Sequence, residues 1–131
     1  MKTKNRILVI DDDRPLSEMV KLNLEATGDY EVRVENRSVL AISAALQFRP
    51  DLILLDYIMP GLDGGEVSKG LGEHPLLCHV PLIMVTALAS NNEMGPDGAS
   101  HRGGHLMLAK PIKLAKLLRC IEQQLMSGAV A

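Results

Sequence analysis

Short apolar runs recur along the chain and alternate with longer stretches in which apolar residues follow a helical period. Four runs are almost purely apolar, at 7–10, 52–55, 82–85 and 106–109. A fifth segment, 30–34, alternates apolar with charged residues, as a less buried strand does. Short buried strands separated by helices are typical of repeated βα units, so the pattern predicts a parallel sheet.

The helical segments carry their own start and stop signals. Asp13 can cap a helix that Pro15 begins and Gly28 ends. The predicted strands lie near 6–11, 30–34, 51–56, 80–86 and 105–109, and the predicted helices at 14–27, 39–49, 65–72, 88–94 and 112–126. The run Gly-Pro-Asp-Gly at 95–98 predicts that the fourth of these helices is short or irregular. With right-handed crossovers, these elements make an open, doubly wound α/β sheet of five parallel strands with about five helices on its two faces.

Composition narrows the class of protein. A chain of 131 residues, 47% of them hydrophobic, is the size of one domain, which we place at 1–131 with its core at about 5–127. The net charge of -2 gives no general attraction to nucleic acid or to membranes, so we expect neither as a direct partner. The first apolar run ends at three aspartates, which makes it too short for a signal peptide or a membrane span. We expect a cytoplasmic protein, monomeric or a weak homodimer.

Reactive side chains stand at the ends of the four apolar runs. Asp11 and Asp12 follow the first, Asp56 the second, Thr86 the third and Lys110 the fourth. In a parallel sheet the carboxyl ends of the strands meet at one crevice, where ligands bind. The pattern therefore predicts one site that contains three carboxylates, a hydroxyl and an ammonium.

This donor set suits a divalent cation and a phosphoryl group. Mg²⁺ prefers a few carboxylate oxygens and fills its other positions with water and phosphate oxygens. Asp56 is placed to act as an oxygen nucleophile that forms an acyl phosphate, while Thr86 and Lys110 can contact phosphoryl oxygens. Taken singly, each residue has a plainer explanation: a solvated acidic run that caps a helix, an aspartate in a turn, a strand threonine or a surface lysine.

The order and spacing of these residues resemble a known family. Ile10-Asp11-Asp12, the run from Pro50 to Asp56, Met59-Pro60 with Asp63-Gly64, Val85-Thr86-Ala87 and Lys110-Pro111 together resemble the receiver domain of two-component response regulators. The similarity extends from about residue 5 to 127. It implies a flavodoxin-like fold with the strand order 2-1-3-4-5.

The resemblance also implies roles for the site residues. Asp56 would accept a phosphoryl group from a sensor histidine kinase or a histidine phosphotransfer protein. Asp12, Asp56 and the backbone carbonyl of Ile58 would bind Mg²⁺ directly, and Asp11 through water. Thr86 and Lys110 would hold the phosphoryl group, and Thr86 would move toward it, passing a conformational signal to an effector domain or protein. The protein would be a switch and not an enzyme, apart from slow self-phosphorylation from small donors and slow self-dephosphorylation.

The sequence departs from the receiver pattern at two places. Met107 stands three residues before the lysine, where such receivers usually carry a switching Tyr or Phe, so either a modified switch or a plain core methionine fits. The segment 88–104 is broken by glycine and proline. Two alternatives therefore stay open: a non-phosphorylated pseudo-receiver that only binds proteins, and an aspartate-nucleophile phosphatase of the haloacid dehalogenase type, for which Asp11 and Asp13 have the right spacing.

Overall fold

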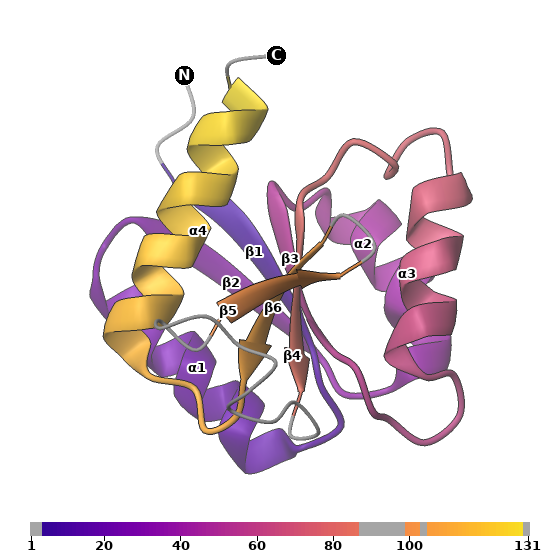
Figure 1. The fold of residues 1–131 in the computed structure, drawn as a ribbon, viewed down its shortest axis with the longest axis horizontal. Coiled ribbons are helices and arrows are strands. Elements are labelled where there is room, and N and C mark those ends of the chain that lie inside the picture. Colours follow the sequence, from indigo (N-terminus) through magenta and orange to yellow (C-terminus); the bar gives the residue numbers. More distant parts are fainter. Residues whose placement is uncertain (1–3, 87–98, 103–104, 130–131) are drawn as a thin grey trace.

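The computed structural model describes residues 4–86, 99–102 and 105–129 (Figure 1). The strands are β1 (Asn5–Ile10), β2 (Tyr30–Glu35), β3 (Leu52–Asp56), β4 (Leu82–Thr86), β5 (Ala99–Arg102) and β6 (His105–Ala109). The helices are α1 (Arg14–Ala26), α2 (Ala41–Phe48), α3 (Gly64–Glu73) and α4 (Leu114–Ala129), and a 3-10 turn, η1 (Ser38–Leu40), leads into α2.

The six described strands belong to one sheet with the order β2-β1-β3-β4-β6-β5. Every neighbouring pair from β2 to β6 is parallel. The predicted order 2-1-3-4-5 is therefore confirmed, with β6 as the fifth parallel strand. β5 is an additional edge strand that pairs antiparallel with β6, with Ser100 opposite Met107. The apolar pattern did not predict it, because the residues Ala-Ser-His-Arg carry no strand signal.

The described helices cover both faces of the sheet (Figure 1). One buried cluster joins side chains of α1 and α4 to one face of the strands, including Leu24, Leu117 and Ile121. A second cluster joins α2 and α3 to the other face, including Ala45, Val67 and Leu71. Because successive side chains of β1 and β3 point alternately into these two clusters, their apolar runs are unbroken, as in sheets covered on both sides.

The helix boundaries follow the predicted signals. The carboxylate of Asp13 accepts a hydrogen bond from the Leu16 N–H at 3.0 Å, which caps α1. Gly28 adopts φ 83° just beyond the end of that helix, a conformation that only glycine adopts freely. At α3, Asp63 acts as the same kind of cap by accepting from the Glu66 N–H. These caps fix where the loops that precede the two helices end.

The predicted irregular helix at 88–94 lies outside the described residues. Within the segment 88–104, which the sequence analysis described as broken by glycine and proline, the structure has the strand β5 at 99–102. In the described part of the chain, no helix combines the length and the apolar character that crossing a membrane requires.

Candidate functional site

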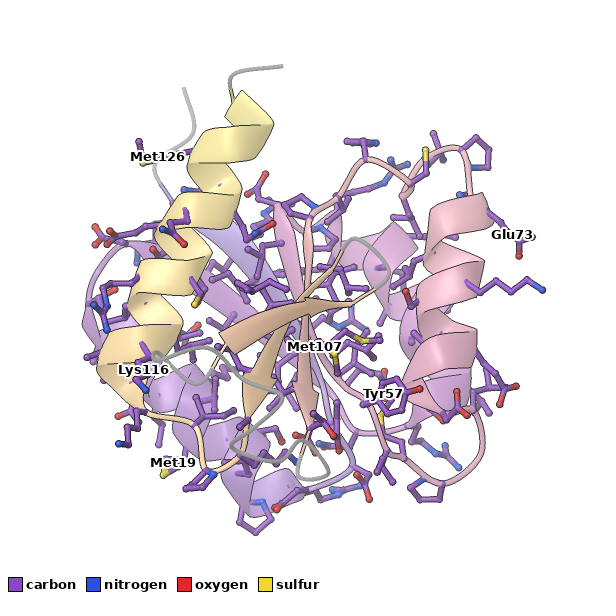
Figure 2. All side chains as sticks on the ribbon, viewed as in Figure 1. Met19, Tyr57, Glu73, Met107, Lys116 and Met126 are labelled. Carbon is purple, nitrogen blue, oxygen red and sulfur yellow. The ribbon has the colours of Figure 1, made fainter. Side chains whose placement is uncertain are left out.

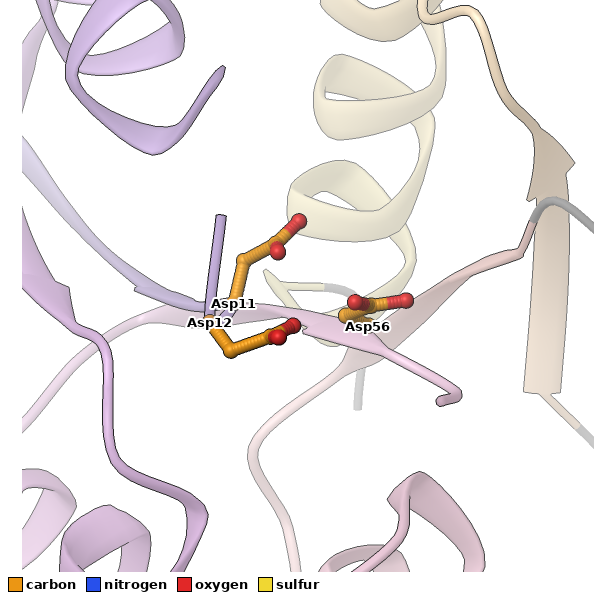
Figure 3. A group of neighbouring side chains, drawn as sticks. All are labelled: Asp11, Asp12 and Asp56. Atoms are coloured by element: carbon orange, nitrogen blue, oxygen red, sulfur yellow. The ribbon is translucent and has the colours of Figure 1, made fainter. Parts of the chain in front are cut away.

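Three carboxylates converge at the carboxyl ends of β1 and β3. Asp11 and Asp12 directly follow β1, and Asp56 is the last residue of β3, which pairs with β1 in parallel. One carboxylate oxygen from each of the three lies within 4.8 Å of the others, and Figure 3 shows the three side chains as neighbours. Asp11 and Asp56 are each 5% exposed, whereas Asp12 is open to solvent. The adjacent strands thus create the cluster that the sequence predicts.

Lys110 completes the cluster from the far side of β4. It follows β6, and its backbone N–H donates to the Thr86 carbonyl at 2.9 Å. Its Nζ lies 3.2 Å from Asp11 Oδ2 and 3.4 Å from Asp56 Oδ2. The Lys110–Pro111 peptide bond is cis. One ammonium therefore bridges the two buried carboxylates.

The electrostatics of Asp56 reflect this crowding. Burial, and then the negative charge of Asp11, raise the pKa of Asp56 to about 6, although Lys110 and the Ile58 N–H oppose the shift by stabilising the charged form. Burial lowers the pKa of Lys110, but Asp11 and Asp56 outweigh it and keep that pKa above its ordinary value. Lys110 is therefore a fixed cation at neutral pH, and Asp56 is a carboxylate held ionised against an unfavourable environment.

The two loops that carry the carboxylates are ordered by local hydrogen bonds. Asp11 Oδ1 accepts from the Asp13 N–H at 2.9 Å, and Asp56 Oδ1 accepts from the Ile58 N–H at 3.3 Å. In each case the second carboxylate oxygen faces Lys110. The exposed carboxylate of Asp12 therefore lies on the open side of the cluster.

The other predicted site residues are Thr86, Ile58 and Met107. Thr86 is the last residue of β4 and is 2% exposed. Ile58 is two residues beyond Asp56 and is 47% exposed. Met107 is not at the site: it lies on the α3 side of β6, where it belongs to a buried cluster with Met84 and Met59 (Figure 2).

Two polar residues between β2 and α2 support the site and were missed by the sequence analysis. Asn36 Nδ2 donates to the Asp11 carbonyl at 2.7 Å and to Ser17 Oγ at 3.0 Å. Ser38 Oγ donates to the Pro60 carbonyl at 2.8 Å and accepts from the Leu62 N–H at 2.9 Å. No spacing rule points to them, because their partners are far away in sequence.

The donor set fits a hard divalent cation. Three carboxylates meet there, and among the described residues the ammonium of Lys110 is the positive charge that contacts them. The ionised carboxylates therefore carry more negative charge than Lys110 balances. Carboxylate oxygens with an open side for water and phosphate are the surroundings that Mg²⁺ prefers. The acidic cluster therefore matches the expected cofactor in donor chemistry and in charge.

The sequence matches a known protein family and several of its members. Residues 7–122 match the family described as "Response regulator receiver domain". The chain is 35% identical over 115 residues to the "DNA-binding dual master transcriptional regulator RpaA" of Synechocystis sp., covering 86% of this chain and 46% of RpaA. It is 31% identical to the "Polar-differentiation response regulator DivK" of Brucella anthropi, covering 91% of this chain and 94% of DivK.

Solved structures extend the similarity to the fold. A putative response regulator from Chloroflexus aurantiacus superposes with a TM-score of 0.78 at 29% identity, covering 94% of this chain and 98% of that one. A response regulator receiver domain protein from Methanospirillum hungatei gives 0.80 at 25% identity, covering 96% and 97%. The chain therefore spans about half the length of RpaA, whereas it spans most of the length of DivK. On its sequence and its fold, this chain belongs to the response regulator receiver domains of two-component signalling.

Proposed function

We propose that this receiver domain accepts a phosphoryl group on Asp56 from the phosphohistidine of a sensor histidine kinase or a histidine phosphotransfer protein, in the presence of Mg²⁺. One observation carries the proposal: Lys110 reaches Asp11 and Asp56 together, inside a cluster of three carboxylates. A plain helix cap or a turn aspartate needs neither the second acid nor the lysine.

The chemistry is an in-line transfer. An oxygen of the Asp56 carboxylate attacks phosphorus, the bond from phosphorus to the imidazole nitrogen breaks, and the histidine leaves with the bonding electron pair. The product is an acyl phosphate on Asp56 and a neutral histidine on the donor. The protein contributes mainly position and charge, as in other phosphoryl transfers.

Each residue of the site has a role in this transfer. Asp12, Asp56 and the Ile58 carbonyl would hold Mg²⁺ directly, with Asp11 acting through water; when bound, the ion neutralises charge on the phosphoryl oxygens. The Lys110 ammonium would pair with a phosphoryl oxygen and the Thr86 hydroxyl would donate to another. Because Nζ of Lys110 lies beside Asp56 Oδ2, it needs only a short movement to follow the new charge.

The remaining parts of the proposal concern the whole chain. We assign 1–131 to one receiver domain with its core at about 5–127, a switching module located in the cytoplasm and not a turnover enzyme. It would act as a monomer or weak homodimer and pass its signal, through Thr86 and the neighbouring strands, to an effector domain or protein. The DNA-binding function in the name of RpaA belongs to that protein, and no direct contact with nucleic acid is proposed here.

Two other functions stay in competition. A pseudo-receiver would keep the fold and bind partners without being phosphorylated. A phosphatase of the haloacid dehalogenase type would use Asp11 as its nucleophile with Asp13 as the second acid. The structure uses Asp13 as the cap of α1, where its side chain accepts from the Leu16 N–H, which disfavours that second role.

Intact mass after incubation with acetyl phosphate and Mg²⁺ tests the proposal. We expect the parent to gain one phosphoryl group, and we expect neither Asp56→Asn nor the parent in excess EDTA to gain any. A folded parent that gains nothing at saturating Mg²⁺ would favour the pseudo-receiver. Continuous turnover of a phosphate ester that survives Asp56→Asn would favour the phosphatase.

A further inference from the structure

We infer that the connection between β2 and α2 is a clamp that holds the two metal-binding loops at a set separation, with Asn36 and Ser38 as its positioning residues. The inference rests on the proposed function, because it assigns these two residues to the Mg²⁺ site. Neither side chain belongs to the acidic cluster. Each acts through the backbone of a loop that carries one part of that cluster.

Asn36 orients the loop that follows β1. The Asp11 N–H donates to the Glu35 carbonyl at 3.1 Å, which continues the ladder between β1 and β2. Asn36 then donates from Nδ2 to the Asp11 carbonyl at 2.7 Å. The carbonyl of Asp11 and the N–H of Asp12 share one peptide plane, so this hydrogen bond sets the direction in which both aspartates leave the backbone.

The second hydrogen bond of Asn36 ties this loop to the first turn of α1. Nδ2 also donates to Ser17 Oγ at 3.0 Å, and Ser17, which is fully buried, donates to the Asp13 carbonyl at 2.9 Å. The residues on both sides of Asp12 are therefore anchored to the same amide group. Asp12 itself is exposed, and among the described residues its side chain has no hydrogen bond or ion pair that could orient it instead.

Ser38 holds the loop that follows β3. Its hydroxyl, on a residue 4% exposed, donates to the Pro60 carbonyl and accepts from the Leu62 N–H. Gly61 lies between them at φ 87°, and a Cβ there would come within 3.0 Å of Ser38 Oγ, so the contact is tight.

The end of this loop, at Gly64, is hydrogen-bonded to its beginning, at Tyr57. The Gly64 N–H donates to the Tyr57 carbonyl at 2.7 Å, and a Cβ on Gly64 would come within 2.5 Å of Tyr57 Cα. Because Tyr57 lies between Asp56 and Ile58, fixing Pro60 and Leu62 through Ser38 also limits the movement of the proposed ligands.

A clamp is needed here because the cluster repels itself. The three carboxylates lie within 4.8 Å of one another on two separate loops, and Lys110 offsets only part of their repulsion, because it brings one positive charge to two of them. The repulsion that remains favours separating those loops until a divalent cation binds. Asn36 and Ser38 are two residues apart on one short connection, so each loop is held by the same piece of backbone. A site held near its metal-bound spacing loses less free energy to rearrangement when the ion enters.

The test measures Mg²⁺ dissociation constants by calorimetry for the parent, Asn36→Ala, Ser38→Ala and Thr27→Ala. Thr27 is the matched control, because its hydroxyl also makes one donated and one accepted hydrogen bond, to the Leu24 carbonyl at 2.8 Å and from the Asp29 N–H at 3.2 Å, at the opposite end of α1. We expect each clamp variant to bind Mg²⁺ about tenfold more weakly than the parent, the lower end of the loss seen when a residue supporting a metal ligand is removed. We expect Thr27→Ala to bind like the parent.

A second measurement needs no metal. Amide hydrogen exchange in the metal-free folded proteins should become faster at Asp13 in Asn36→Ala and at Ile58 in Ser38→Ala, because these N–H groups bond to the carboxylates of the two loops. It should be unchanged at both positions in Thr27→Ala. If Asn36→Ala or Ser38→Ala does not fold, Asn36→Ser and Ser38→Gly replace them.

The outcomes separate the two proposals. A parent that does not bind Mg²⁺ contradicts the proposed function itself. A parent that binds Mg²⁺, with both clamp variants within twofold of it and with unchanged exchange, overturns the clamp and leaves the proposed function standing. Equal weakening in the clamp variants and in Thr27→Ala would also overturn the clamp, since it would trace the effect to general loss of stability.

Discussion

At the scale of single residues, Asp56 shows most directly how the fold alters ordinary chemistry. An aspartate in a solvent-exposed turn at the end of a strand would be ionised at any pH near neutral. Here burial and the neighbouring Asp11 raise its pKa to about 6, and Lys110 limits the shift. The carboxylate is ionised at neutral pH but at a cost to the folded state, which a bound cation would reduce.

The raised pKa gives a prediction for metal-free stability. The pKa of Asp56 is about 6 in the folded state and 3.8 in the unfolded state, so between these values the folded state binds more protons, and stability falls as pH rises through that window. Asp56→Asn removes this loss. The full shift corresponds to about 3 kcal/mol, and solvent at the open side of the site reduces this to about 1 to 2 kcal/mol.

Urea unfolding in EDTA between pH 4 and pH 7.5 measures the difference. We expect Asp56→Asn to exceed the parent in unfolding free energy at pH 7.5 and the gap to narrow toward pH 4. Because other carboxyl groups titrate in both proteins, only the difference between the two counts. A gap that stays constant with pH would contradict the assignment of the raised pKa to Asp56.

At the scale of elements, the end and the interior of strand β6 have different roles. Its end delivers Lys110 to the acidic cluster, whereas its interior places Met107 in the core between the sheet and α3. Met107 is 6% exposed and lies opposite Met84 on β4 and Ser100 on β5. The structure thus agrees with the plainer of the two interpretations of this position, a core methionine; a switching role stays a prediction.

Truncating Met107 tests this division. We expect Met107→Ala to lower the unfolding free energy by about 2 to 4 kcal/mol, because it leaves a cavity in a packed cluster. Its Mg²⁺ affinity should stay within twofold of the parent, since the side chain is on a different part of β6 from Lys110. Met126→Ala is the control: the same change at a side chain that is 69% exposed should alter stability by less than about 0.5 kcal/mol.

Urea unfolding and calorimetry with Mg²⁺ give the two values for Met107→Ala. A fall in Mg²⁺ affinity as large as that expected for the clamp variants would mean that the β6 core and the site are coupled. That result would support the predicted switching role of Met107.

At the scale of the whole molecule, metal binding should be visible as stability. An ion that binds only the folded state stabilises it in proportion to the logarithm of its concentration above the dissociation constant, by about 2.7 kcal/mol at a hundredfold excess. We therefore expect Mg²⁺ to raise the thermal midpoint of the parent and to leave Asp12→Asn nearly unchanged. Sodium chloride at equal ionic strength controls for general screening of charge.

The measurement is a thermal melt at increasing Mg²⁺. An equal rise in both proteins would mean that the stabilisation comes from elsewhere on the surface, and the three-carboxylate site would lose its support.

The sequence was a good guide wherever the signal was local. Strand ends, the cap at Asp13 and the stop at Gly28 depend on neighbours within a few residues, and the structure has them at or close to their predicted positions. β5 has no such signal: four small or polar residues become a strand because β6 offers them a free edge.

The same distinction holds for the site. By itself, the sequence determined which chemical groups end the four apolar strands, and the parallel order of those strands then requires Asp11, Asp12, Asp56 and Lys110 to meet at one edge. Only the tertiary structure decided that Lys110 bridges two of the acids, that Met107 is buried away from them, and that Asn36 and Ser38 hold both loops. These contacts join segments separated by 20 residues or more in most cases, as in the 25 residues between Asn36 and Asp11, and their distances depend on how the whole chain packs.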